Sequence, residues 1–274
     1  MSLNTLGSIA SVIGLIIAVL SCFLGNTGVS FWNIALVGIT CIPMGIFLYQ
    51  GNTSNKYADG LREIQSIHKD VLKHYNDYKG KDLKDSTQKL SQVCLKVSQA
   101  FNTMRDIHTS VCIKYINCEG DKYYVKTLCR DSISMNDREE IDDDAHGMDA
   151  INDNTDFRYI FEKYKETKKW DGVYYFSNYL PLKHQYSNTH LDTSKISDNR
   201  FSFLTRSRNW PLPYKSTIVV PIISNVDGAL YGFLCIDSPK NKGFDEKRDV
   251  DILQNVALYL GATIKLISEQ SLKQ

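Results

Sequence analysis

Two uninterrupted apolar runs dominate the first fifth of the chain. The first covers residues 6–24 and the second residues 31–49, so each is 19 residues long. At about 1.5 Å of rise per residue, a helix of this length reaches roughly 28 Å, close to the ~30 Å hydrocarbon core of a bilayer. A short, turn-rich break separates the runs. The pattern therefore predicts a two-span transmembrane helical hairpin over residues 1–55.

The distribution of charge agrees with this reading and orients the hairpin. No Asp, Glu, Lys or Arg precedes Lys56, although the chain carries 32 basic and 31 acidic residues. Basic residues then follow the second run, and the loop between the runs has none. The positive-inside rule thus predicts a protein of the bacterial inner (plasma) membrane with its C-terminal part in the cytoplasm. A cleavable signal peptide is disfavoured because no basic residue precedes the first run. A buried helical pair in a soluble protein stays open.

A heptad-like stripe follows the second run and predicts a connecting helix, or stalk, over residues 56–85. Apolar and aromatic residues recur there at alternating steps of three and four: Leu61, Ile64, His68, Val71, Tyr75 and Tyr78. Such a stripe can form the seam between two helices. We therefore expect a homo-oligomer.

From residue 86 onward the pattern changes to that of an α+β domain. Apolar steps of three and four predict helices over residues 90–104, 157–167 and from about 244 to the C-terminal end. Runs rich in β-branched and aromatic residues predict strands at 110–117, 122–130, 172–180, 217–223 and 229–237. The acidic segment 131–156 has almost no apolar periodicity, so an exposed, mobile loop is expected.

Composition excludes several classes of protein. A formal net charge of +1 argues against a general nucleic-acid binder. The seven cysteines include no Cys-x-x-Cys pair, so neither a zinc site nor a thioredoxin-type motif is indicated, and reduced, buried thiols are expected. No phosphate-binding glycine loop, nucleophile elbow or His-Glu-x-x-His motif occurs. We expect no cofactor, no metal and no enzymatic activity.

Several positions in the last third resemble the closing half of a GAF domain. They are the run at 218–222, Gly228, the run at 232–238, Phe244, Asp249 and Leu253. The resemblance extends over roughly residues 86–268 and implies a GAF-like antiparallel sheet flanked by helices, within a cytoplasmic sensory domain of residues 86–274. GAF domains bind cyclic nucleotides, tetrapyrroles, small metabolites or gases through haem, and some bind nothing. A GAF-fold methionine sulfoxide reductase would need cooperating cysteines, for which Cys118 and Cys129 are the candidates on neighbouring strands.

The segment 181–215 would form one wall of the GAF pocket, and it is rich in cations and rings. Its candidate ligand-binding residues are Arg200, Phe203, Arg206, Arg208, Trp210 and Lys215. A guanidinium offers a planar fork to phosphate or carboxylate, and an aromatic ring offers a stacking face. These residues suit an anionic ligand with a flat ring, such as a nucleotide. The alternative is that the charges face solvent or meet the acidic segment.

Two functions follow. In the first, the chain is a membrane-anchored sensor that binds a small, anionic ligand and transmits the signal to its transmembrane hairpin. In the alternative, it is a nucleotide-activated, membrane-disrupting effector of an anti-phage defence system. The expected partners are the lipid bilayer, the small-molecule ligand and further copies of the chain, without nucleic acid.

Overall fold

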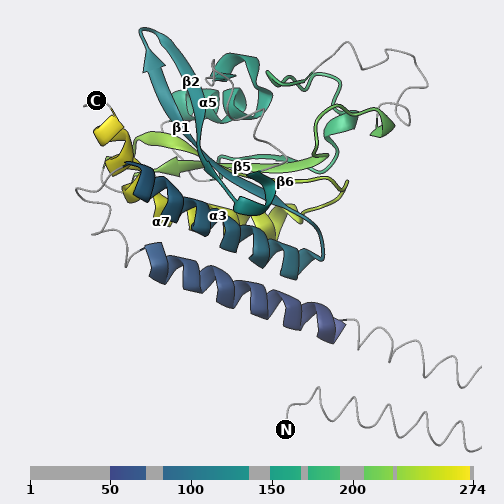
Figure 1. Cartoon of the computed structure of the whole chain (residues 1–274). Helices are drawn as coiled ribbons and strands as arrows, with labels where there is room; N and C mark the ends of the chain where they lie inside the picture. Colours follow the sequence, from purple (N-terminus) through teal and green to yellow (C-terminus); the bar gives the residue numbers. More distant parts are fainter. Residues whose placement is uncertain are drawn as a thin grey trace, which may run out of the picture. The chain divides into compact units, whose positions relative to one another are not determined.

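A computed structural model describes residues 50–71, 83–135, 149–167, 172–191, 207–224 and 227–271 (Figure 1). The two predicted membrane spans and residues 192–206 of the predicted pocket segment 181–215 lie outside these ranges. The chain divides into two compact units, Met1–Ala58 and Asp59–Gln274. The second unit contains the sheet and every helix and strand labelled below.

One antiparallel sheet forms the centre of the second unit. In the described residues its strands lie in the order β3-β2-β1-β6-β5-β4. Their bounds are β1 Ser110–Glu119, β2 Lys122–Arg130, β3 Asp149–Ala150, β4 Tyr175–Ser177, β5 Ser216–Ile223 and β6 Leu230–Ser238. The hairpins β1–β2 and β5–β6 are both local, and the pairing of β1 with β6 joins them into one sheet. Four of the five predicted strands are confirmed within two residues, whereas β4 is much shorter than the predicted run.

Helices cover both faces of the sheet. The long helices α3 (Leu83–Arg105) and α7 (Glu246–Ser271) lie on one face, and α5 (Thr155–Thr167) lies on the other (Figure 1). The apolar stripe that predicts α3 is fully used, because Leu90, Val97 and Phe101 have no exposed surface. Short 3-10 turns, Ile151–Asp153 and Leu180–Leu182, connect the elements on the side of α5. The predicted helices are confirmed, and the fold is α+β.

Helix α7 approaches strand β5 unusually closely. A Cβ atom added to Gly261 of α7 would lie 1.9 Å from the carbonyl oxygen of Ile223. Glycine is the residue that permits such contact between backbones. By length and composition alone, the described segment Glu246–Ile267 could also cross a membrane, but half of its apolar window is buried in the domain. Its burial against the sheet accounts for its apolar character.

The predicted stalk is helical over residues 50–71, and its last half packs against the domain. Ile64, Ile67 and Val71 are buried, and the ring of His68 lies 3.8 Å from the ring of Tyr259 in α7, measured between centroids. Gly60 approaches Met104 of α3. Part of the stripe that predicts a dimer seam is therefore occupied within one chain. Tyr75 and Tyr78 lie outside the described residues, and the homo-oligomer stays a prediction.

The acidic segment 131–156 differs from its prediction as an exposed loop. At its start, Asp131 is fully buried and accepts hydrogen bonds from the backbone N–H groups of Val111 and Ser134 at 2.7 and 2.8 Å. At its end, Asn154 and Asp156 are buried as well. The prediction is wrong for these ends, because their carboxylates and amides satisfy backbone donors inside the domain. Residues 136–148 lie outside the described ranges.

A buried ion pair fixes the start of α7. Asp249 has no exposed side-chain surface, and its Oδ2 atom lies 2.6 Å from Nε of Arg105, at the end of α3. The same oxygen accepts the backbone N–H of Asp245 at 2.8 Å, while Asp245 Oδ1 accepts the N–H of Arg248. These bonds satisfy N–H groups that the first helical turn leaves open. One carboxylate thus both caps α7 and ties it to α3.

Replacing Asp249 by alanine should destabilise the protein strongly. The change removes the carboxylate next to a mostly buried guanidinium, which typically costs about 3–5 kcal/mol. Urea unfolding would measure the loss. The matched control is Asp251→Ala, an exposed carboxylate two residues further along the same helix, which should change stability by less than about 0.5 kcal/mol. Equal effects of the two substitutions would contradict the assigned role of Asp249.

Candidate functional site

A pocket lies on the face of the sheet opposite α3 and α7. Strands β1, β5 and β6 supply its floor, and the start of α5 and two segments, 188–190 and 212–214, supply its walls. Alternation along β1 explains the placement, since Ile113 packs under the sheet while Cys112 and Lys114 line the pocket. The cavity has a volume of about 50 Å³. One water needs at least about 10–15 Å³ of such space, so the cavity admits a group of a few atoms.

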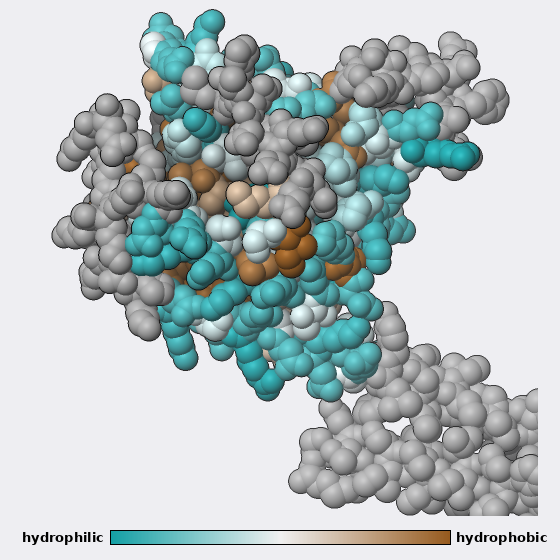
Figure 2. Space-filling view, in the orientation of Figure 1, coloured by the Kyte–Doolittle hydropathy of each residue, from teal (hydrophilic) through white to brown (hydrophobic). Residues whose placement is uncertain are grey.

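Ionisable side chains of both signs surround the cavity. They are Lys114, Arg130, Asp149, Asp156, His190 and Asp237. Two of the carboxylates come from the acidic segment and one from the end of β6. On the helical side of the domain, by contrast, hydrophilic residues lie on the outer surface (Figure 2). Charged groups concentrated in a mostly apolar cavity are typical of a ligand site.

Asp149 links the strand floor to the wall. Its Oδ2 lies 3.5 Å from Nζ of Lys114, and its Oδ1 lies 3.2 Å from Nε2 of His190. Burial would raise the pKa of Asp149, but the hydrogen bond with His190 and the charge of Lys114 lower it to about 2. The carboxyl is therefore ionised at neutral pH and holds the Lys114 and His190 side chains in place.

Asp156 is a second buried carboxyl with the opposite behaviour. It lies in the first turn of α5, where Oδ1 accepts the N–H of Phe157 at 2.9 Å and Oδ2 accepts the hydroxyl of Tyr186 at 3.4 Å. Burial raises the pKa of Asp156 to about 6, and the charge of Asp237 acts in the same direction. This group can exchange a proton with a ligand near neutral pH, as a site of general acid or base chemistry requires.

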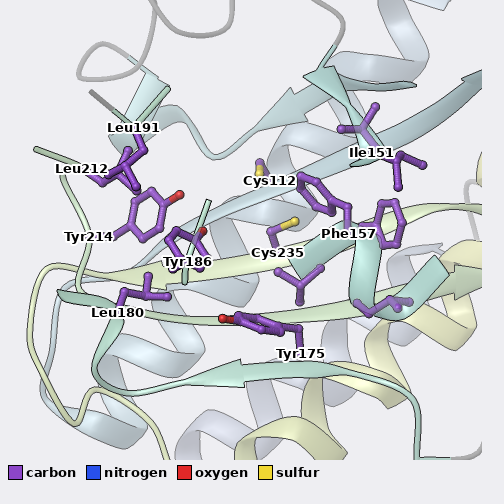
Figure 3. Packing of buried hydrophobic residues seen from close by; sticks show 14 of the residues in the cluster. Cys112, Ile151, Phe157, Tyr175, Leu180, Tyr186, Leu191, Leu212, Tyr214 and Cys235 are labelled. Carbon is purple, nitrogen blue, oxygen red and sulfur yellow. The ribbon is translucent and has the colours of Figure 1, made fainter. Parts of the chain in front are cut away.

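Aromatic side chains form the wall behind these carboxyls. Tyr175, Tyr186 and Trp210 follow one another with ring centroids 6.3 Å apart, and the indole N–H of Trp210 donates to the carbonyl of Tyr214 at 2.7 Å. Figure 3 shows Tyr186 and Tyr214 on the same side of the cluster as Leu212, with Phe157 facing them across Cys112 and Cys235. The wall is held by packing, and only its inner edge reaches the cavity.

Two thiols lie on the pocket floor. Cys112 of β1 and Cys235 of β6 are buried, line the cavity and are direct partners in the register of the two strands. A hydrogen bond from Cys235 lowers the pKa of the Cys112 thiol to about 7 against the effect of burial, and Arg130 and Lys114 add to the lowering. The same hydrogen bond and burial raise the pKa of Cys235 well above its usual value.

The described residues contain no group of three or more His, Cys, Asp or Glu side chains arranged to hold a metal ion. Cys118 and Cys129, the cysteines singled out from the sequence, do not meet in the pocket. Cys118 is exposed at the tip of the β1–β2 hairpin, and Cys129 lies 3.9 Å from Cys94 of α3, measured between sulfur atoms. Both are thus remote from the cavity floor.

None of the predicted ligand-binding residues that the structure describes lines the cavity. Arg200, Phe203 and Arg206 lie outside the described residues. Arg208 is exposed, Lys215 is half-buried next to β5, and Trp210 is buried in the wall. Among the described lining residues, none of the last three occurs. The ligand-binding role of all six stays a prediction.

The residues that line the cavity were not among those predicted from the sequence. Lys114 carried a usable signal, since it is a lone charge between Ile113 and Tyr115 in an apolar strand. Asp237 closes a run of buried residues in the same way. Asp149, Asp156 and His190 had no such signal, because they belong to polar segments whose burial depends on the tertiary fold.

A protein-family model matches part of this domain. The family model described as "GAF domain" matches residues 183–264. A solved structure of a GAF domain is 17% identical, with 72% of this chain and 87% of that chain covered and a TM-score of 0.43. No curated protein matches the chain. Residues 183–264 thus match a GAF-domain model, and GAF domains are typically sensors that bind ligands.

Similar solved structures also include enzymes. The free methionine-R-sulfoxide reductase of Neisseria meningitidis, solved with its substrate, is 14% identical, with 78% of this chain and 93% of that chain covered and a TM-score of 0.46. The type II enzyme of Thermoplasma acidophilum is 15% identical, with 69% and 96% covered and a TM-score of 0.41. At these identities the likeness concerns the fold alone. The expectation that the chain is not an enzyme is corrected, because the fold includes enzymes.

Asp156→Asn should stabilise the protein at neutral pH but not at pH 4. The pKa of Asp156 lies above its usual value in the folded protein, so the folded state binds the proton more tightly than the unfolded state. Ionisation therefore costs stability as pH rises from about 4 to about 6, and the cost remains above that range. Asparagine keeps the acceptor oxygen without the charge. We expect a gain of about 2–3 kcal/mol at pH 7.

Urea unfolding at pH 4 and at pH 7 would measure this gain. The control is Asp153→Asn, an exposed position next to the same helix, for which no comparable change is expected. A gain of the same size at both pH values would show that burial of the Asp156 charge is not its cause.

Proposed function

We propose that the chain is a membrane-anchored sensor whose GAF domain binds a small ligand through an anionic group. The observation that carries this proposal is that Lys114 and Arg130 both line one small cavity. Both side chains are largely buried, with 14% of the Lys114 side chain and 6% of Arg130 exposed. Charge-assisted hydrogen bonds to buried cations are among the strongest polar contacts that a site offers.

The cavity also favours a particular kind of anion. Its volume of about 50 Å³ suits a carboxylate or phosphate group rather than a whole nucleotide. Asp156 and Asp237 lie in the same cavity and match a donor or positive group on the ligand. For a nucleotide, the phosphate would occupy this cavity, and the base would require the wall at 212–214 to move outward or would lie outside it.

Membrane anchoring is supported by the two apolar runs at residues 6–24 and 31–49, which are long enough to span a bilayer. With the basic residues that follow them, they favour the bacterial inner membrane and a cytoplasmic GAF domain. A homo-oligomer would bring several such hairpins together. These parts of the proposal rest on the sequence.

Transmission of the bound state is supported by the packing of residues 59–71. Ile64, Ile67 and Val71 are buried against the helical layer that covers the reverse face of the pocket floor. Lys96 of α3 forms an ion pair with Asp70. A change in the sheet would therefore reach this helix through α3 and α7. This coupling requires that the interface has two packing arrangements and that the pocket binds the ligand with a different affinity in each.

Lys114→Ala should weaken the binding of a small anion about tenfold or more. The reason is the loss of a charge-assisted hydrogen bond, worth about 1.5–3 kcal/mol. Calorimetric titration with inorganic phosphate and with acetate would measure the change. Lys126→Ala is the matched control, because Lys126 is exposed on the neighbouring strand and does not line the cavity. An equal loss of affinity in both variants would show that the effect comes from the overall charge of the protein. Absence of anion binding by the parent protein would refute the proposal.

The anchor has its own test. We expect the full-length chain to stay in the membrane fraction after an alkaline carbonate wash, and a variant without residues 6–49 to be released. Release of the full-length chain would refute the anchor. Depolarisation of vesicles by the full-length chain only when a nucleotide is present would instead favour the alternative, a membrane-disrupting defence effector.

A further inference from the structure

The pocket floor carries a pair of cysteines that ligand binding alone does not require. We propose that Cys112 and Cys235 form a dithiol that reacts with hydroperoxides entering the pocket and closes to a cross-strand disulfide. The inference does not depend on the identity of the proposed ligand, because the two cysteines are part of the cavity floor itself. It assigns to the domain a redox site with a defined class of substrate.

The strand register places the two cysteines at a spacing that a disulfide can span. Cys112 and Cys235 are direct Cα partners across β1 and β6. Direct partners in an antiparallel pair have Cα atoms about 4.5 or 5.5 Å apart. A disulfide needs about 4.4–6.8 Å. Their thiols already form a hydrogen bond. The bond can therefore close without a shift of either strand.

A hydroperoxide can reach these thiols although both cysteines are buried. The side chains retain only 3% and 4% of their surface, but that surface faces the cavity. The cavity volume of about 50 Å³ admits a molecule of two heavy atoms such as hydrogen peroxide. The pocket is thus selective by size for a small oxidant.

The charges around the pair favour Cys112 as the nucleophile. Thiolates, not thiols, attack peroxides. Cys112 is the member of the pair whose pKa is lowered, by the hydrogen bond of Cys235 and by the cations Arg130 and Lys114. The pKa of Cys235 is raised, so this thiol keeps the proton that the second step needs.

The other described cysteines lack this combination. Cys94 and Cys129 lie between α3 and β2 and do not line the cavity, and burial raises the pKa of Cys94 well above its usual value. Cys118 is exposed and donates its thiol proton to the carbonyl of Gly120 at 3.2 Å. It has access but no partner thiol nearby among the described residues. These three cysteines serve as internal controls.

The proposed oxidation proceeds in two steps. In the first, the Cys112 thiolate attacks one peroxide oxygen, the O–O bond breaks, and the leaving hydroxide takes a proton to become water, which leaves a sulfenic acid. In the second, the Cys235 sulfur attacks the Cys112 sulfur, the S–O bond breaks, and the hydroxyl leaves as water with the proton of the Cys235 thiol. Two electrons pass from the sulfur atoms to the peroxide. A small cellular thiol would then reduce the disulfide to the two free thiols by thiol–disulfide exchange.

The test is a disulfide map of the full-length protein. Reduced protein would be treated with stoichiometric hydrogen peroxide, its remaining thiols alkylated, and its peptides analysed by mass spectrometry. We expect a linked Cys112–Cys235 peptide pair, a loss of two hydrogen atoms, and full recovery of both thiols with dithiothreitol. The linked pair must appear before Cys118 is oxidised.

Single substitutions provide the controls. Cys112→Ser and Cys235→Ser should each abolish the linked pair, and Cys235→Ser should leave a sulfenic acid at Cys112 that a dimedone reagent traps. Cys94→Ser should leave the pair unchanged. A link between Cys94 and Cys129 in place of the proposed one would overturn the proposal. The proposal would also be overturned if both pocket thiols of the wild-type protein could still be alkylated after Cys118 had been oxidised. This outcome does not depend on the folding of any variant.

Discussion

The pairing of β1 with β6 is the constraint on which the rest of the domain depends. Each strand belongs to a local hairpin, and more than one hundred residues of sequence separate them. Their register puts Cys112 beside Cys235 and sets Lys114 and Asp237 along the same face. A slip by one residue would turn these side chains toward α3 and α7 and bring apolar ones into the cavity. The pocket therefore exists only in this register.

The elements of the fold were predictable where one face of an element is buried. The steps of three and four along α3 and α7 mark residues that the structure buries almost completely, such as Leu90, Phe101 and Leu253. Strands β1, β2, β5 and β6 have long apolar runs and clear turns. The predicted strand at β4 was too long, because only three of its residues pair with β5. Its apolar neighbours form part of a 3-10 turn and of the aromatic wall instead.

The site was much less predictable, and the reason is the distance in sequence between its parts. The interpretation of the sequence concentrated on one cationic segment, whereas the cavity collects single residues from several elements. Asp149 and Asp156 belong to a segment predicted to be exposed. In the structure Asp156 is buried and Asp149 is partly buried, because α5 packs over the sheet. His190 gains its significance from the contact with Asp149. Such contacts depend on tertiary packing, which residue type and local periodicity do not encode.

The contact of Gly261 with Ile223 has a mechanical consequence. Elsewhere a side chain separates a helix from the sheet beneath it and can absorb a small displacement by changing its rotamer. At this position the backbone of α7 touches the carbonyl at the end of β5 with no side chain between them. A displacement of that strand end toward α7 must therefore displace the helix backbone directly, because no side chain lies between them to absorb it. In this respect α7 is a stiff component of the domain, and its stiffness depends on the absence of a single methyl group.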